Sequence, residues 1–97
     1  MLTSKQRAYL RGLANSLDSI FQVGKGGISE NLTAQLNDVL RVRELVKLRV
    51  LETVGETPKD IAAELVEATG ADCVQVIGSR IVLYKPNPEE PKIELPK

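Results

Sequence analysis

Segments with helical periodicity alternate with short strand-like segments along this chain, and their order restricts its fold more than any other feature. The helical segments repeat apolar residues at i, i+3, i+4 and i+7, whereas the strand-like segments are short apolar or alternating runs. Gly78–Ser79 would form a tight hairpin turn between the last two strands. We expect helices within residues 3–17, 30–43 and 57–70, and strands within residues 19–24, 44–54, 72–78 and 80–85. The order α-β-α-β-α-β-β predicts an α/β fold in which a single-layer, mixed four-stranded sheet is packed by about three helices.

Residues that cap helix ends support the three predicted helices. Thr3 and Gln6 have the spacing of a capping box, in which each side chain binds the backbone of the other residue. Ser29 and Thr57 are suitable N-caps for the second and third helices. Gly70 is a typical helix stop, because glycine adopts the left-handed conformation without strain.

The strand within residues 44–54 alternates between apolar and basic residues. Val46, Leu48 and Val50 would point to one face, and Lys47 and Arg49 to the other. This pattern predicts a half-exposed strand with a basic outer face.

Length and proline content predict one domain followed by a tail. A chain of 97 residues can bury one modest core. Residues 1–85 contain all the expected helices and strands and form the predicted domain. Residues 86–97 contain four prolines and should be extended. At most, residues 92–95 could add to a sheet edge.

The charges are divided unevenly between the two halves of the chain. Residues 1–49 carry eight Lys or Arg and four Asp or Glu, whereas residues 50–97 carry five and nine, so the net charges are +4 and −4. The whole chain is neutral, but this division is typical of a protein with a basic surface on one side.

The composition argues against several classes of function. Histidine is absent and Cys73 is the only cysteine, so the chain lacks the commonest general base and the ligands of a structural zinc site. We therefore expect no metal, cofactor or catalytic residue. No apolar run is long enough to cross a membrane, and the first residues lack the features of a signal peptide. These features and the absence of paired cysteines predict a cytoplasmic protein.

The most distinctive motif is the G-x-x-G sequence formed by Gly24, Lys25, Gly26 and Gly27, between a predicted strand and a predicted helix. Glycines allow a close approach of another backbone, and the helix behind the loop directs free N–H groups toward the same place. The motif lacks the spacing of a Walker A loop and of a dinucleotide-binding fingerprint. A short G-x-x-G loop holds nucleic-acid backbone in KH domains. The alternative interpretation is an ordinary turn.

Basic residues in the first half of the chain strengthen the nucleic-acid hypothesis. Taken singly, each could be an ordinary solvated charge, a helix-end residue that complements the dipole, or a charge that protects a strand edge. Together with the loop glycines they form the candidate nucleic-acid-binding set: Gly24, Lys25, Gly26, Gly27, Arg7, Arg11, Arg41, Arg43, Lys47 and Arg49.

Four sequence segments together resemble the bacterial YhbY/YqeI family of stand-alone CRM domains. The segments are the opening "LTSKQRAYLRGLANSL", the loop "VGKGGISENL", the hairpin "VQVIGSRIVLYKP" and the ending "KIELPK". The resemblance covers essentially the whole chain and is more specific than the G-x-x-G motif alone.

This resemblance implies a fold similar to the C-terminal domain of translation initiation factor three. It also implies RNA binding and association with precursors of the large ribosomal subunit (pre-50S), with ribosomal proteins as further possible neighbours. The residues expected to contact RNA are those of the loop, Gly24 to Gly27, and the basic residues Lys25, Arg41, Arg43, Lys47 and Arg49.

Two other functions remain open at the level of sequence. An interaction module could dock a protein through the acidic third helix, which carries Glu64 and Glu67, and through the Pro-rich tail. A small enzyme could use the glycine loop as an anion site, but no catalytic base or nucleophile–base pair can be identified.

Overall fold

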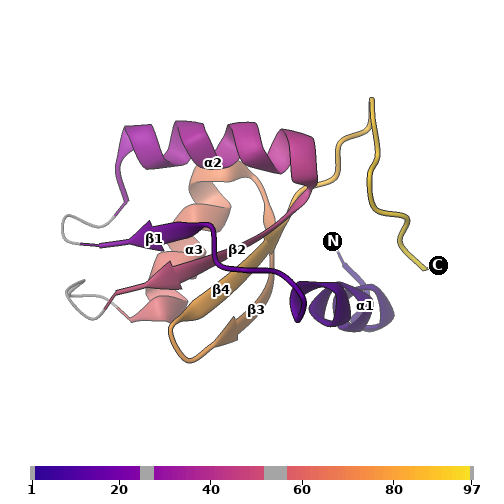
Figure 1. Ribbon diagram of the computed structural model, residues 1–97, viewed down its shortest axis with the longest axis horizontal. Coiled ribbons are helices and arrows are strands. Elements are labelled where there is room, and N and C mark those ends of the chain that lie inside the picture. The colour runs from indigo at the N-terminus through magenta and orange to yellow at the C-terminus, as the bar shows by residue number, and fades with distance from the viewer. Residues whose placement is uncertain (1, 25–27, 52–56, 97) are drawn as a thin grey trace.

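The described residues form three helices and four strands in the predicted order. The computed structural model describes residues 2–24, 28–51 and 57–96. The elements are α1 (Ser4–Ala14), β1 (Phe21–Val23), α2 (Glu30–Arg43), β2 (Leu45–Val50), α3 (Pro58–Thr69), β3 (Asp72–Ile77) and β4 (Arg80–Tyr84). The strands form one sheet in the order β1-β2-β4-β3 (Figure 1). β1 and β2 are parallel, and the other two pairings are antiparallel, which confirms the predicted mixed sheet.

The predicted caps are confirmed at all three helices. The Thr3 hydroxyl accepts a hydrogen bond from the Gln6 backbone N–H, and the Gln6 side chain accepts one from Thr3 N–H, both at 3.1 Å. Ser29 and Thr57 cap α2 and α3, and Gly70 ends α3 with a φ of 75°. In the described part of the chain, no helix is long and apolar enough to cross a membrane.

The first helix ends earlier than the sequence suggested. It stops at Ala14 rather than near residue 17, because Ser16 N–H and Leu17 N–H bind carbonyls three residues back and form tighter turns. The first strand is also shorter than predicted, although Ile20 N–H still donates to Lys47 O at 3.2 Å.

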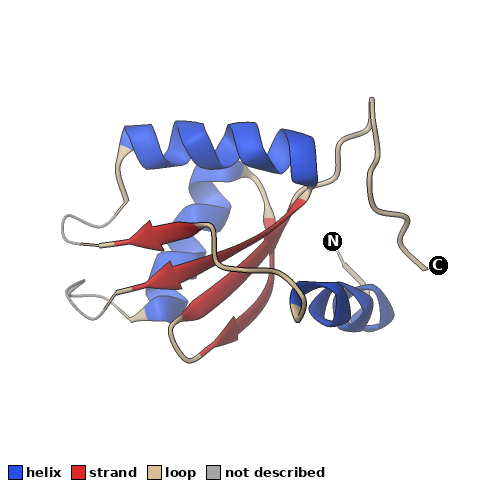
Figure 2. Cartoon of the chain, viewed as in Figure 1, coloured by secondary structure: helices blue, strands red, loops and turns tan. Residues whose placement is uncertain are grey.

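Helices α2 and α3 cover one face of the sheet, which we call the inner face (Figure 2). Apolar residues from both helices and from the inward-pointing positions of the strands pack there and exclude water. This main core contains Val23, Leu36, Leu40, Val46, Leu48, Val50, Ile61, Ala62, Leu65, Ala71, Ile81 and Leu83. Burial of these side chains is the main stabilising contribution.

Helix α1 covers only part of the opposite face, which we call the outer face. Leu10 and Ala14 pack there against a second core cluster that includes Leu45, Val82 and Tyr84. The prediction of a half-exposed, basic β2 is therefore correct only at the far end of the strand, because α1 buries its first residues. The part of the outer face that α1 leaves uncovered lies toward the C-terminal end of β2, at Arg49.

A charged residue that the sequence analysis did not single out fixes the C-terminal segment. Glu44 follows α2 with a φ of 64°, and its side chain is fully buried. Its carboxylate accepts hydrogen bonds from three backbone N–H groups, those of Asn87 at 2.7 Å, Ile93 at 2.8 Å and Lys92. These charge-assisted bonds satisfy a carboxylate that would otherwise be costly to bury.

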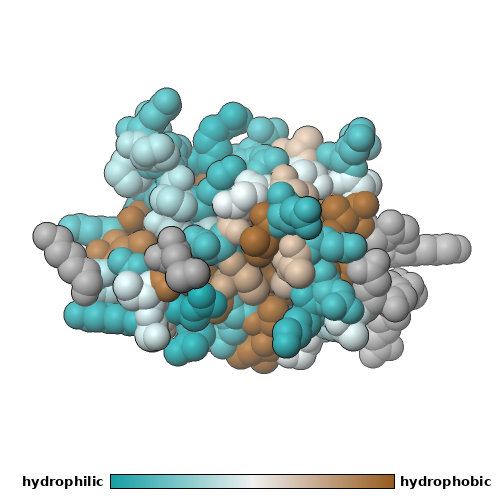
Figure 3. Space-filling model, turned by 180° about the vertical axis from the view of Figure 1, so that it is seen from behind, coloured by the Kyte–Doolittle hydropathy of each residue, from teal (hydrophilic) through white to brown (hydrophobic). Residues whose placement is uncertain are grey.

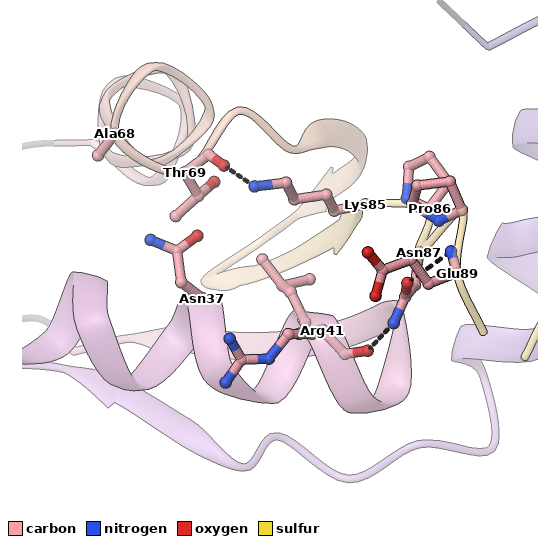
Figure 4. Close-up of a pocket in the computed structure, with 10 residues that line it drawn as sticks. Asn37, Arg41, Ala68, Thr69, Lys85, Pro86, Asn87 and Glu89 are labelled. Carbon is pink, nitrogen blue, oxygen red and sulfur yellow. Dashed lines mark hydrogen bonds between the residues drawn. The ribbon is translucent and has the colours of Figure 1, made fainter. Parts of the chain in front are cut away.

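Further hydrogen bonds fasten the start of this segment to the two inner helices (Figure 4). The Lys85 ammonium donates to Thr69 O at 2.7 Å, and the Asn87 amide donates to Arg41 O at 2.8 Å. Residues 92–95 form no strand, so the suggested addition to a sheet edge is wrong. The N–H groups of residues 92 and 93 would be needed for hydrogen bonds to a neighbouring strand, but they bind the Glu44 carboxylate instead.

The pKa of Tyr84 leads to a prediction about stability at alkaline pH. Burial, with smaller effects of Glu44 and Asp72, raises the pKa of its phenol above the ordinary value of 10.0. Because the folded state holds this proton more tightly, the stabilisation is fully present below about pH 10 and is lost as the pH rises through the folded pKa.

We therefore expect the free energy of unfolding of the native protein to fall relative to that of a Tyr84→Phe variant between about pH 9 and about pH 11. Urea denaturation at a series of pH values measures this difference. A constant difference across the range would contradict the assignment.

Candidate nucleic-acid interface

Two arginines lie opposite each other on the uncovered part of the outer face. Arg49 of β2 and Arg80 of β4 are register partners, and both are exposed. Within residues 2–24, 28–51 and 57–96, no carboxylate lies within 4.0 Å of either guanidinium. Like charges directly opposite in a sheet are destabilising, so this pair has an energetic cost that a bound anion would remove.

Arg80 is a candidate that sequence reasoning missed. It lies in the acidic half of the chain, and its nearest basic neighbour in sequence is Lys85, five residues further on. The feature that places Arg80 on the same face as Arg49 is the register between β2 and β4. That register depends on the pairing of β2 with β4, which are separated by α3 and β3.

Helix α1 contributes two of the predicted basic residues to the border of this surface. Gln6 contacts the C-terminal segment on one flank of α1, and Leu10 faces the sheet. Helical spacing then places Arg7 and Arg11 on the other flank, toward the uncovered part of the outer face. Arg7 also donates a hydrogen bond of 2.7 Å to Cys73 O, which holds its guanidinium against the edge of the sheet.

Lys47 lies between the covered and uncovered parts of the outer face. Its ammonium is 3.4 Å from both Ala14 O and Leu17 O, at the C-terminal end of α1. A cation at this position complements the partial negative charge of the helix end. Lys47 is therefore partly neutralised, and it is less available to a ligand than Arg49.

The glycine loop follows β1 at the same end of the sheet as Arg49. β1 and β2 are parallel, with Gln22 paired to Arg49, and Leu51 N–H donates a hydrogen bond to Val23 O at 2.9 Å, so Gly24 and Leu51 lie next to each other. A Cβ atom at Gly24 would lie 3.3 Å from Leu51 Cδ1, which gives this glycine a packing role as well. Lys25, Gly26 and Gly27 lie outside the described residues.

The N-terminus of α2 is the other part of the predicted phosphate cradle. The Ser29 hydroxyl accepts a hydrogen bond from Leu32 N–H at 3.1 Å. This bond satisfies one of the backbone N–H groups in the first turn that have no partner within the helix. Glu30 lies in the first turn, and its charge offsets part of the positive potential there. The helix end alone is therefore a weaker anion site than the sequence pattern suggested.

Arg41 and Arg43 do not join this surface. Both lie in the last turn of α2, and a helix of 14 residues is about 21 Å long, so they are at the opposite end from the glycine loop. Arg41 is also paired with Asp38 at 2.9 Å. The expectation that all the basic residues surround the loop is therefore wrong for these two.

Five acidic residues lie on the helix layer over the inner face, and the other described ones lie in the C-terminal segment or at Asp18, Glu44 and Asp72. The exposed positions of α2 and α3 include Glu30, Asp38, Asp60, Glu64 and Glu67. The view from behind Figure 1 shows hydrophilic side chains over much of that side, with apolar residues in patches near the middle (Figure 3). The same two helices also carry three basic residues, Arg41, Arg43 and Lys59, so their net charge is −2. The neutral chain is therefore polarised between a cationic outer face and a weakly acidic helix layer.

Cys73 has the properties of a packing residue. Burial raises the pKa of its thiol above the ordinary value, although the nearby Arg7 partly opposes this effect. A thiol with a raised pKa is a weak nucleophile at neutral pH. Among the described residues, no group of three or more acidic or cysteine side chains could hold a metal ion.

Comparisons with known proteins place the chain in a family. The model of the CRS1 / YhbY (CRM) domain matches residues 2–85. A Bacillus subtilis protein named "Probable RNA-binding protein YqeI" is 47% identical over 96 residues, which cover 99% of this chain and all of the relative. A Haemophilus influenzae protein named "RNA-binding protein" is 38% identical and covers 99% of this chain and 96% of its own length.

A solved structure supports the same conclusion. The solution structure of a hypothetical protein from Staphylococcus aureus has a TM-score of 0.83 and 52% sequence identity, and the match covers 99% of this chain and all of that one. The resemblance inferred from the sequence motifs is thereby confirmed: the chain belongs to the CRS1 / YhbY (CRM) domain family.

Proposed function

We propose that this protein binds the phosphate backbone of RNA and performs no catalytic step. The observation that carries the proposal is the Arg49–Arg80 pair, which lies exposed on an open sheet face without a carboxylate partner among the described residues. Arg7 and Arg11 border that face, and the G-x-x-G loop of Gly24–Gly27 follows β1 at the same end of the sheet as Arg49. The names of the relatives, which describe RNA-binding proteins, support this ligand.

The positions of the aromatic residues favour contacts with phosphates over stacking on bases. Tyr84 is buried beneath α1, and Phe21 packs against the main core. The exposed aromatic residue, Tyr9, lies on α1 and not on the open sheet. Proteins that read single-stranded bases usually present aromatic side chains on an open sheet, as RRM domains do. Phosphate contacts position a protein without reading sequence, so specificity would come from the shape of the RNA.

The finer part of the proposal concerns the biological target. The family resemblance favours ribosomal RNA in precursors of the large subunit, in the cytoplasm, with ribosomal proteins as neighbours. Crosslinking in cell extract, followed by mapping of the contacted nucleotides, tests this target. Crosslinks spread evenly over unrelated RNAs would contradict it.

The dependence of RNA affinity on salt tests the backbone-binding mode. Each phosphate neutralised adds about 0.7–0.9 to the slope of log K against log salt, so about five cations predict a slope of roughly −3 to −5. Titration of a labelled RNA hairpin, followed by fluorescence anisotropy, measures the slope. A Lys25→Gln variant should reduce it by about one unit if the loop contacts a phosphate.

A slope near zero would refute backbone binding as a whole. An unchanged slope in the Lys25→Gln variant would remove only the loop from the interface. The two results are therefore distinguishable.

A docking role for the acidic third helix and the tail receives less support. The N–H groups of Asn87, Lys92 and Ile93 are bound to Glu44, so the tail is held against the protein's own surface. A partner that required a free tail would first have to break these hydrogen bonds.

A further inference from the structure

A groove separate from the arginine pair lies where β2 begins. It has a volume of about 570 Å³. Three parts of the chain form its walls: the segment that links α1 to β1, the last turn of α2, and the C-terminal segment at Lys92 and Ile93. We call it the β2-start groove. The C-terminal end of α2 lines the groove, whereas its N-terminal end follows the glycine loop in the chain. The groove is therefore about one helix length away from that loop.

The groove exposes apolar side chains to solvent. Val42 is 62% exposed and Ile20 is 44% exposed, and both belong to the small group of strongly exposed large apolar residues in the described part of the chain. Leu13, Leu17 and Ile93 add further apolar surface to the lining. Exposed apolar residues that gather in one concavity are typical of a protein-binding surface.

The charges around the groove are mostly positive. Arg43, Lys47 and Lys92 line it, whereas Asp18 is the one acidic residue in its lining among the described positions. Arg43 and Lys92 are exposed; Lys92 is paired with Glu90 at 3.8 Å, whereas the described structure gives Arg43 no carboxylate partner, so Arg43 is the main cation available to a ligand. An occupant with acidic groups beside apolar ones would match this lining.

The groove is also preformed, because Glu44 holds one of its walls. The buried carboxylate accepts hydrogen bonds from the N–H groups of Lys92 and Ile93, and these bonds fix the part of the C-terminal segment that lines the groove. A preformed wall reduces the entropy that a partner would lose on binding.

We propose that the β2-start groove binds a protein segment in which apolar residues stand next to Asp or Glu. The apolar lining favours a protein over RNA, because a phosphate backbone cannot cover Val42 and Ile20 with apolar surface. The basic rim favours an acidic segment over a basic one. This proposal assigns Arg43 to a contact with a protein partner. It does not depend on the RNA-binding proposal.

Selection from a displayed library of random short peptides tests the proposal on the whole protein. The enriched peptides should contain apolar residues beside Asp or Glu, and synthetic copies should bind the native protein in fluorescence titrations. Val42→Glu and Arg43→Glu should each weaken that binding by about tenfold or more. Both positions are exposed, so the variants should fold, and circular dichroism checks this.

Ile77→Glu is the matched control, because Ile77 is 58% exposed on β3, away from the groove. It should leave peptide binding unchanged. The proposal is overturned if no acidic–apolar peptides are enriched, or if Val42→Glu and Ile77→Glu have equal effects. It is also overturned if Val42→Glu weakens binding of the RNA hairpin but not of the peptides, since the groove would then belong to the RNA surface.

Discussion

Replacement of both Arg49 and Arg80 by glutamate is expected to weaken binding of a labelled RNA hairpin by roughly 100-fold at about 0.1 M salt. Loss of one phosphate contact costs about five- to eightfold at this salt concentration, because each contact contributes about 0.7–0.9 to the logarithmic slope. Two lost contacts account for roughly 25- to 60-fold, and repulsion between the new carboxylates and the phosphates adds the rest. Fluorescence anisotropy measures the loss directly.

The matched control reverses two charges on the helix layer. A variant with Arg41→Glu and Lys59→Glu has the same net charge, and both positions are exposed on α2 and α3. It should change affinity only slightly, because its charges lie away from the outer face. If the two double variants lose equal affinity, overall charge governs binding, and the assigned surface is wrong.

The single variant Arg80→Glu separates function from folding. It replaces a pair of like charges by an opposite-charge pair with Arg49, which should stabilise the sheet by about 0.2–1 kcal/mol. RNA binding should weaken at the same time. A variant that is more stable but binds RNA less tightly would show that the arginine pair contributes to RNA binding at a cost in folding stability.

Glu44→Ala should have the largest effect on stability, with a loss of about 3 kcal/mol. The substitution removes the acceptor of the N–H groups of Asn87, Lys92 and Ile93 and leaves an apolar residue at a positive φ. Urea denaturation measures the loss. Hydrogen exchange should also accelerate at these three amides, because the segment that carries them is no longer fastened.

A substitution in the same segment serves as the control. Glu94 is exposed, so Glu94→Ala should change stability by less than about 0.5 kcal/mol. If Glu44→Ala has an equally small effect and leaves exchange at Asn87 unchanged, the buried carboxylate does not hold the C-terminal segment.

The fold could be predicted from the sequence because its local signals agree with one another. Thr3, Ser29 and Thr57 cap the three helices, and each helix begins at the following residue. The alternation in residues 45–50 also identified the inward-facing side chains of β2 correctly. Signals of this kind act over a few residues, so they can be read without knowledge of the tertiary contacts.

The candidate site was harder to predict, because it depends on contacts between distant segments. The basic character of Arg41 and Arg43 was evident, but only the direction of α2 shows that they lie far from the glycine loop. Arg80 becomes a candidate only through its pairing with Arg49. Glu44 resembled an ordinary charge at a helix end, and its three partners lie 43, 48 and 49 residues further along the chain.

The opposite charges of the two layers have a consequence for encounter with a ligand. A neutral chain exerts little net attraction at a distance, so it should not adhere strongly to every polyanion. Its separated charges act instead as a dipole, and at physiological ionic strength their field extends only about 8 Å. A polyanion that comes this close would turn the molecule until the sheet faces it and the helices face the solvent.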